Sequence, residues 1–85
     1  MKRLSEAQRR TMTYLTHEHG AFAAWKEYAR GYVVFDRNGI TLFRGPTQPR
    51  TITALEALGL VEHVGAERVG PTAEAWARAH KGELR

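Results

Sequence analysis

The sequence predicts a single α+β domain over residues 1–85, with three to four helices, a central β-hairpin and a shorter second hairpin. Its 42% hydrophobic and 26% charged residues are typical of one folded domain. Several segments place apolar side chains at helical spacing and begin with residues that favour a helix start. An Asn-Gly dipeptide also separates two runs rich in β-branched and aromatic residues, which predicts a hairpin.

The first predicted helix runs from Ser5 to about His19. Ser5 and Gln8 fit a capping box, in which each side chain bonds the other residue's backbone N–H, and Gly20 favours a C-terminal stop. Residues 21–29 allow a short helix or a strand, and their alanines and aromatic spacing favour the helix. The core-facing side of the first helix is predicted to comprise Leu4, Ala7, Gln8, Thr11 and Leu15.

The central hairpin is predicted to join strands 32–35 and 40–43 through a turn at 36–39. Residues 45–49 include one glycine and two prolines and are expected to break the second strand. A helix at about 49–58 follows. Its cap is Thr47 or Gln48, Pro49 suits its first turn, and Gly59 is its left-handed C-terminal residue.

The remaining segments predict a strand at 60–64, a tight turn, a return strand at 68–70 and a last helix from residue 73 to about 81. Thr72 is the expected cap of that helix. Most of the larger aromatic residues are expected in the core, because so small a domain needs large apolar groups there. They are Trp25, Tyr28, Tyr32, Phe35, Phe43 and Trp76, with Trp76 as the anchor of the last helix.

Several classes of function are disfavoured by what the sequence lacks. There is no cysteine, so disulfides, thiolate metal sites and cysteine nucleophiles are excluded. No nucleophile elbow, phosphate-binding glycine loop or dinucleotide motif is present, so we expect neither an enzyme nor a bound cofactor. His17 and His19 are two residues apart, which on a helix points them in different directions and disfavours a metal site. No apolar run spans a bilayer and no hydrophobic signal segment is present, so we expect a cytoplasmic protein without a membrane partner.

Charge gives the first indication of a partner. The chain carries 13 Lys and Arg against nine Asp and Glu, a net charge of +4. Residues 1–55 hold nine basic and four acidic residues, whereas residues 56–85 hold four basic and five acidic ones. A basic excess confined to one part of a small domain favours a polyanion such as nucleic acid.

Residues 51–62, followed by a turn and by residues 68–76, resemble the C-terminal half of winged helix-turn-helix DNA-binding domains. The resemblance covers about residues 47–79. It implies a winged-helix-like fold in which the helix at about 49–58 enters the major groove of DNA and the second hairpin is a short wing. The contacts carried over by position are Thr47, Gln48, Arg50, Thr51 and Thr53 on the helix and Arg68 on the wing.

Further arginines are expected beside that helix. Arg44 lies at the base of the central hairpin, whose tip bears Arg37 and Asn38, and a cationic finger of this kind can touch phosphates. If the protein binds DNA, one surface should hold Arg9, Arg10, Arg44, Arg50 and Arg68.

The sequence therefore predicts a double-stranded DNA-binding protein, a small transcriptional regulator, acting as a homodimer on a palindrome with the first helix as a dimer element. One departure from the family pattern leaves an alternative open. The central hairpin stands where the helix before the recognition helix is expected. A winged-helix module that binds protein, as an adaptor or inhibitor of a nucleic-acid machine, is that alternative. Binding of single-stranded nucleic acid by the aromatic residues is a third option.

Overall fold

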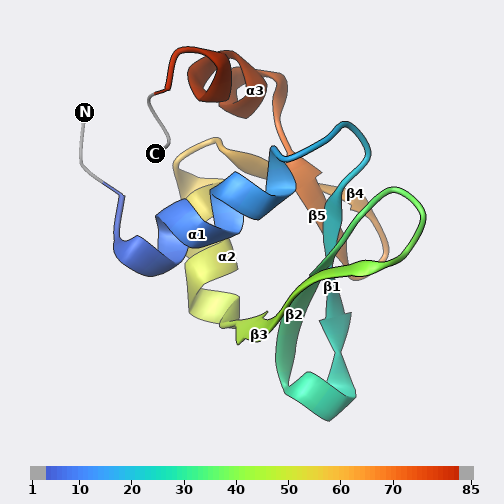
Figure 1. Ribbon diagram of the computed structural model, residues 1–85. Helices are drawn as coiled ribbons and strands as arrows, with labels where there is room; N and C mark the ends of the chain where they lie inside the picture. Colours follow the sequence, from blue (N-terminus) through green and yellow to red (C-terminus); the bar gives the residue numbers. More distant parts are fainter. Residues whose placement is uncertain (1–3, 83–85) are drawn as a thin grey trace.

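A computed structural model describes residues 4–82, except for the side chain of Arg44 (Figure 1). The described chain holds three α-helices, one short 3-10 helix and five strands. Their order is α1 (Glu6–Leu15), β1 (Phe22–Lys26), η1 (Glu27–Ala29), β2 (Gly31–Phe35), β3 (Thr41–Thr47), α2 (Pro49–Ala57), β4 (Val61–Gly65), β5 (Arg68–Pro71) and α3 (Ala73–His80). The α+β class predicted from the sequence is confirmed.

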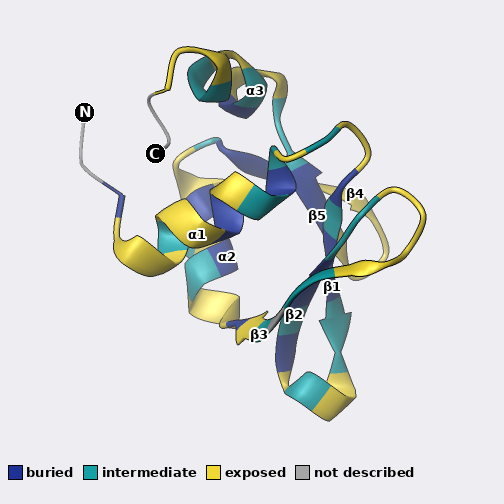
Figure 2. Cartoon of the chain, in the orientation of Figure 1, coloured by how far each residue is buried: buried dark blue, intermediate teal, exposed yellow. Residues whose placement is uncertain are grey.

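The five strands form one antiparallel sheet in the order β3-β2-β1-β5-β4. The helices pack on one face of this sheet, and the core lies between the two layers (Figure 2). Leu15 of α1, Leu55 of α2 and Ala75 of α3 are all fully buried in this core. The strands contribute Ala23, Val34, Val61 and Val69 to the same cluster. No helix of residues 4–82 has the length and apolar character that crossing a membrane requires.

The helix favoured for residues 21–29 is wrong. This segment is the central strand β1 followed by the 3-10 turn η1. β1 is hydrogen-bonded to the neighbouring strand β2 on one side and to β5, which lies far along the chain, on the other, and this pairing overrides the local helix propensity. Its small residue Ala23 lets the helices pack directly on the sheet.

α1 ends at Leu15 rather than near His19. Thr16 is the C-cap, and its hydroxyl donates to the carbonyl of Met12 at 2.7 Å. Residues 16–20 then turn the chain into β1, and Gly20 adopts the left-handed φ of +92°. The buried side of α1 comprises Leu4, Thr11, Met12 and Leu15, whereas Ala7 is exposed and Gln8 is partly exposed, against expectation.

The predicted break at residues 45–49 is also wrong in part, because β3 continues through Gly45 and Pro46 to Thr47. β3 is an edge strand, which is where a sheet tolerates a proline. The hairpin turn itself is held by Asp36, whose carboxylate accepts from the backbone N–H groups of Asn38 and Ile40, both at 2.8 Å. Only Gly39 of the Asn-Gly pair has a positive φ.

The C-terminal half matches the prediction more closely. α2 begins at Pro49, Gly59 has a φ of +76°, and the side chain of Thr72 caps α3 by accepting from Ala75 N at 3.1 Å. Trp76 is not the anchor of α3, because Ala75 is the buried residue and Trp76 stacks on the ring of His19.

None of the aromatic residues expected in the core is fully buried, and only Tyr32 and Phe43 pack against the core from its edge. Tyr28 is 78% exposed, and the other five lie between buried and exposed. Aliphatic side chains and alanines fill the core instead.

Candidate nucleic-acid interface

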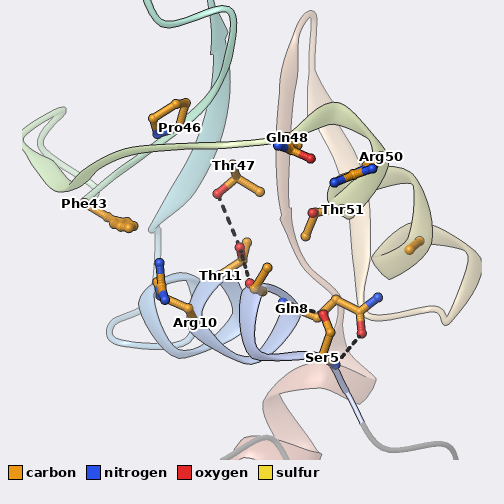
Figure 3. A pocket seen from close by; sticks show the side chains of 12 residues that line it. Ser5, Gln8, Arg10, Thr11, Phe43, Pro46, Thr47, Gln48, Arg50 and Thr51 are labelled. Atoms are coloured by element: carbon orange, nitrogen blue, oxygen red, sulfur yellow. Dashed lines mark hydrogen bonds between the residues drawn. The ribbon is translucent and has the colours of Figure 1, made fainter.

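A groove of about 510 Å³ lies between α1, the end of β3 and the start of α2 (Figure 3). Arg10 and Arg50, which are 40 positions apart in the chain, both line it. Figure 3 shows their guanidinium groups on the two sides of a central pair of threonines. The other polar lining residues are Ser5, Gln8, Thr11, Thr47, Gln48 and Thr51.

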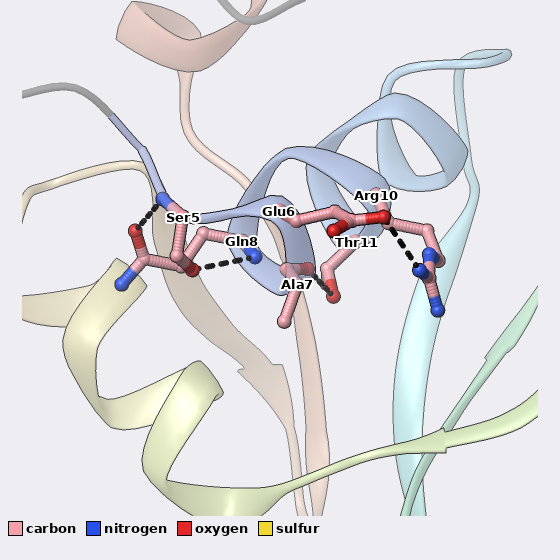
Figure 4. Close-up of polar contacts among 6 residues, drawn as sticks. All are labelled: Ser5, Glu6, Ala7, Gln8, Arg10 and Thr11. Atoms are coloured by element: carbon pink, nitrogen blue, oxygen red, sulfur yellow. Dashed lines mark hydrogen bonds and ion pairs between the residues drawn. The ribbon is translucent and has the colours of Figure 1, made fainter.

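The start of α1 forms one wall because a capping box fixes it (Figure 4). Ser5 N donates to Gln8 Oε1 at 2.9 Å, and Gln8 N donates to Ser5 Oγ at 3.2 Å. This reciprocal pair satisfies two backbone donors at the helix start. It also holds Gln8 at the rim of the groove, one turn ahead of Thr11.

Arg10 is positioned by two weak contacts. Its Nη2 lies 3.4 Å from Glu6 Oε1, one turn earlier, and its guanidinium lies 5.6 Å from the ring centroid of Phe43. Phe43 is itself stacked on Tyr14, with the centroids 5.0 Å apart. Exposed ion pairs and cation–π contacts each contribute only about 0.5–1 kcal/mol, so Arg10 can exchange them for a phosphate.

The floor of the groove is a pair of buried hydroxyls. Thr11 is 4% and Thr47 is 8% exposed, and their Oγ1 atoms are 3.3 Å apart. Thr11 Oγ1 donates its only proton to the carbonyl of Ala7 at 2.9 Å, so Thr47 is the donor in the pair. Thr47 thus ties β3 to α1 and has no proton left for a ligand.

The start of α2 forms the opposite wall. Gln48 is the N-cap, and its side chain makes no capping bond, so its amide group is free to contact a ligand. The first turn of α2 contains no acidic residue. The positive end of the helix dipole therefore adds to the charge of Arg10 and Arg50, which favours an anion in the groove.

The structure brings five of the nine predicted contact residues together in this groove: Arg10, Thr47, Gln48, Arg50 and Thr51. Arg9 and Thr53 are exposed on α1 and α2 but do not line it. Arg44 belongs to β3, and its side chain lies outside the described part of the chain. The sequence reasoning missed Gln8 and Thr11 as groove residues, because their helical spacing assigned them to the core side.

Arg68 lies elsewhere. It belongs to β5 and pairs with Ala24, so its side chain extends on the sheet face opposite the helices. Its guanidinium lies 4.7 Å from the ring centroid of Phe22, and it lines a second cavity of about 280 Å³. This cavity shares no lining residue with the first groove. The expected single surface of arginines therefore does not include Arg68.

The groove is lined by arginines, hydroxyl and amide side chains, alanine, proline and phenylalanine, and none of these lining residues is a carboxylate or a histidine. Elsewhere in residues 4–82, no three His, Asp or Glu side chains are grouped so as to hold a metal ion.

Comparison with protein-family models, curated proteins and solved structures returned no match to this chain.

Proposed function

We propose that the protein binds double-stranded DNA, with the N-terminal half of α2 in the major groove, and acts as a small transcriptional regulator. The observation that supports this most directly is the convergence of Arg10 and Arg50 on one groove beside the start of α2. In this arrangement the groove holds a backbone phosphate while α2 faces the bases. Phosphate contacts then fix the register of the helix, and base contacts give specificity.

The exposed side of α2 is compatible with close approach to base edges. Arg50, Thr53 and Ala57 are all exposed, and their spacing places them along one side of the helix. Thr53 and Ala57, which follow Arg50 on this side, are small and let the helix lie deep in the major groove. There an arginine can bond guanine and a threonine can contact a thymine methyl group. Gln48 at the cap is suited to adenine.

The order α2-β4-β5-α3 supports a winged-helix interpretation of the C-terminal half. The hairpin between β4 and β5 has only Ala66 and Glu67 at its tip, which makes a short wing. Arg68 extends from the far face of the sheet, so we assign the duplex contacts to α1 and α2 rather than to the wing. The β2–β3 hairpin precedes α2 and supplies Thr47 to the groove.

The first test measures the affinity for a mixed-sequence duplex by fluorescence anisotropy at several salt concentrations. We expect the affinity to fall steeply with salt because bound phosphates release counterions. Arg50→Ala should weaken binding by about 1–3 kcal/mol. Lys81→Ala is the matched control, since it removes the same charge from the exposed end of α3, away from the groove. Undetectable duplex binding, or equal effects of the two variants, would contradict the proposal.

The same test bears on the protein-binding alternative. The large exposed apolar side chains of the described chain are Tyr28, Ile40, Leu58 and Val64, which belong to four different elements or turns. No helix or strand of the described residues supplies two of them, so no apolar stripe along one element supports that alternative. A partner protein that co-purifies after nuclease treatment, together with absent duplex binding, would replace the DNA proposal.

A further inference from the structure

The sheet face that points away from the helices carries a row of two aromatic rings and two cations. Strand residues alternate between faces, and Ala23, Val34 and Val69 face the core. Their neighbours therefore lie on the opposite face, which we call the open face. Its described residues on the three central strands are Phe22, Ala24, Lys26, Val33, Phe35 and Arg68, with Gly31 and Gly70.

The long side chains of the open face lie along it. The guanidinium of Arg68 sits over the ring of Phe22, whose centroid is 5.6 Å from that of Phe35, and Lys26 Nζ is 5.5 Å from the Phe35 centroid. This row leaves Ala24 only 6% and Val33 only 3% exposed. Phe22 and Phe35 themselves remain partly exposed.

The two cations of the row are not neutralised by carboxylates. Among the described residues, neither Lys26 nor Arg68 forms an ion pair, and the contacts that each makes with a ring are of the weak, exposed kind. A phosphate group can therefore replace a ring as their partner at little cost. The released ring then becomes available for stacking.

We propose that the open face binds single-stranded DNA. Unpaired bases stack on Phe22 and Phe35, and Lys26 and Arg68 contact the phosphates between them. Stacking on aromatic rings combined with backbone neutralisation is the general chemistry of single-strand binding. A duplex cannot stack on Phe22 and Phe35, because its bases are stacked on each other and expose only their edges.

A cavity next to Phe22 and Arg68 offers room for a further base beside the two rings. This second cavity, of about 280 Å³, is lined by Phe22 and Arg68 together with Val64 and Trp76. Glu62 of β4 is paired with Gly70 and so lies on the same face of the sheet. Its carboxylate repels phosphates, which keeps the backbone of the strand on the row from Lys26 to Arg68.

The choice of DNA over RNA rests on the proposed duplex binding, whereas the proposal that a single strand binds does not. Thr41 of β3 is paired with Phe35 and Glu62 of β4 is paired with Gly70, so side chains with acceptor oxygens border the row on the same face.

The test titrates the full chain into a labelled deoxythymidine oligomer of about 12 nucleotides. We expect binding, and we expect Phe35→Leu to weaken it about tenfold, because leucine keeps Val33 covered but removes the stacking surface. Tyr28→Leu is the matched control, since Tyr28 is 78% exposed in η1, off the open face, and should leave the affinity unchanged. Arg50→Ala should weaken duplex binding and leave oligomer binding unchanged.

A second measurement needs no variant. An oligomer containing 5-iodouracil is cross-linked to the wild-type chain by ultraviolet light, and the adduct is mapped after trypsin digestion. We expect the adduct in residues 31–37, which contain Phe35, or in residues 11–26, which contain Phe22.

Four results would overturn the inference. These are no binding of the oligomer, equal effects of Phe35→Leu and Tyr28→Leu, an adduct confined to residues 45–58 around α2, or a clear preference for the matching uridine RNA. If Phe35→Leu does not fold, as judged by circular dichroism, the position of the cross-linked adduct on the wild-type chain decides whether the open face binds the oligomer. Duplex binding without oligomer binding removes only this inference, and oligomer binding without duplex binding removes only the proposed function.

Discussion

The two threonines at the floor of the groove bear on the predicted DNA contact at Thr47. Thr47 lies directly before the predicted recognition helix, where the winged-helix resemblance places a DNA contact. Its hydroxyl instead donates to Thr11 Oγ1 in a site where both residues are buried. A single hydroxyl has one proton, so its commitment to Thr11 leaves Thr47 a positioning residue for β3 and α1.

Thr47→Val tests this assignment, because valine has the same shape without the donor. We expect the free energy of unfolding to fall by about 0.5–1.5 kcal/mol, the usual net value of one hydrogen bond, as measured by urea denaturation. Duplex affinity should change little. Unchanged stability together with a loss of duplex affinity would instead make Thr47 a direct contact.

Gly20 and Gly39 offer a matched pair of backbone tests. Both have positive φ values, +92° and +83°, which disfavour any other residue. A Cβ at Gly20 would lie 2.6 Å from the Cβ of Arg37, whereas a Cβ at Gly39 would meet nothing within 4 Å. Gly39→Ala therefore measures the cost of the backbone conformation alone.

We expect Gly39→Ala to destabilise the protein by about 1 kcal/mol and Gly20→Ala to cost more, about 2–3 kcal/mol, because the clash is added to the strain. Denaturation curves of the two variants give the comparison. Equal losses would mean that the hairpin tip moves away from Gly20 without cost.

At the level of elements, prediction succeeded where the signal is local. The capping box at Ser5, the cap at Thr72 and the helix between Pro49 and Gly59 depend on residues a few positions apart, and all are present. It failed at residues 21–29, because the partner β5 of strand β1 lies more than 40 residues later in the chain. It also failed at Pro46, since only the sheet order makes β3 an edge.

The residues of the candidate groove also fall into those that the sequence predicts and those that it does not. Arg50 and Gln48 could be predicted because they belong to the helix that the resemblance identifies. Arg10 was predicted only as one of several arginines, since its position depends on α1 meeting β3. Gln8 and Thr11 could not be separated from core positions, because helical spacing gives the buried side of a helix and not what covers it.

Thr72 joins two elements and gives the prediction that belongs to this scale. Its hydroxyl accepts from Ala75 N within α3 and donates to the carbonyl of Gly59 at 2.7 Å, at the end of α2. Thr72→Ala removes both bonds, and we expect a loss of about 1–2 kcal/mol in denaturant titrations. Thr72→Ser keeps the hydroxyl and should retain most of the stability. If Thr72→Ser loses as much stability as Thr72→Ala, the effect belongs to the methyl group of Thr72 and not to its hydroxyl.

For the whole molecule, the fold separates two charged surfaces that the sequence does not distinguish. Arg10 of α1 and Arg50 of α2 line one groove, whereas Lys26 and Arg68 lie on the sheet face opposite the helices. The net charge of +4 is therefore not one basic patch. A duplex bound at the α1–α2 groove leaves the open face accessible, so the two proposed ligands do not compete for the same residues.

The size of the domain leads to a prediction about stoichiometry. α2 has nine residues, and a helix of that length brings only three or four side chains to base edges. One copy therefore reads too few base pairs to select a site, and we expect two copies on a palindrome whose half-sites are about 10 base pairs apart. Each half-site then contributes its own base and phosphate contacts.

Sedimentation of the protein with a palindromic duplex, selected from a random pool, measures this directly. Two chains per duplex are expected, with binding that weakens when about five base pairs are inserted between the half-sites, because the insertion turns one half-site to the opposite side of the helix. Insertion of about ten base pairs, one helical turn, returns both half-sites to the same side of the DNA and serves as the control. One chain per duplex, with affinity independent of the spacing, would mean that a single domain supplies all of the binding.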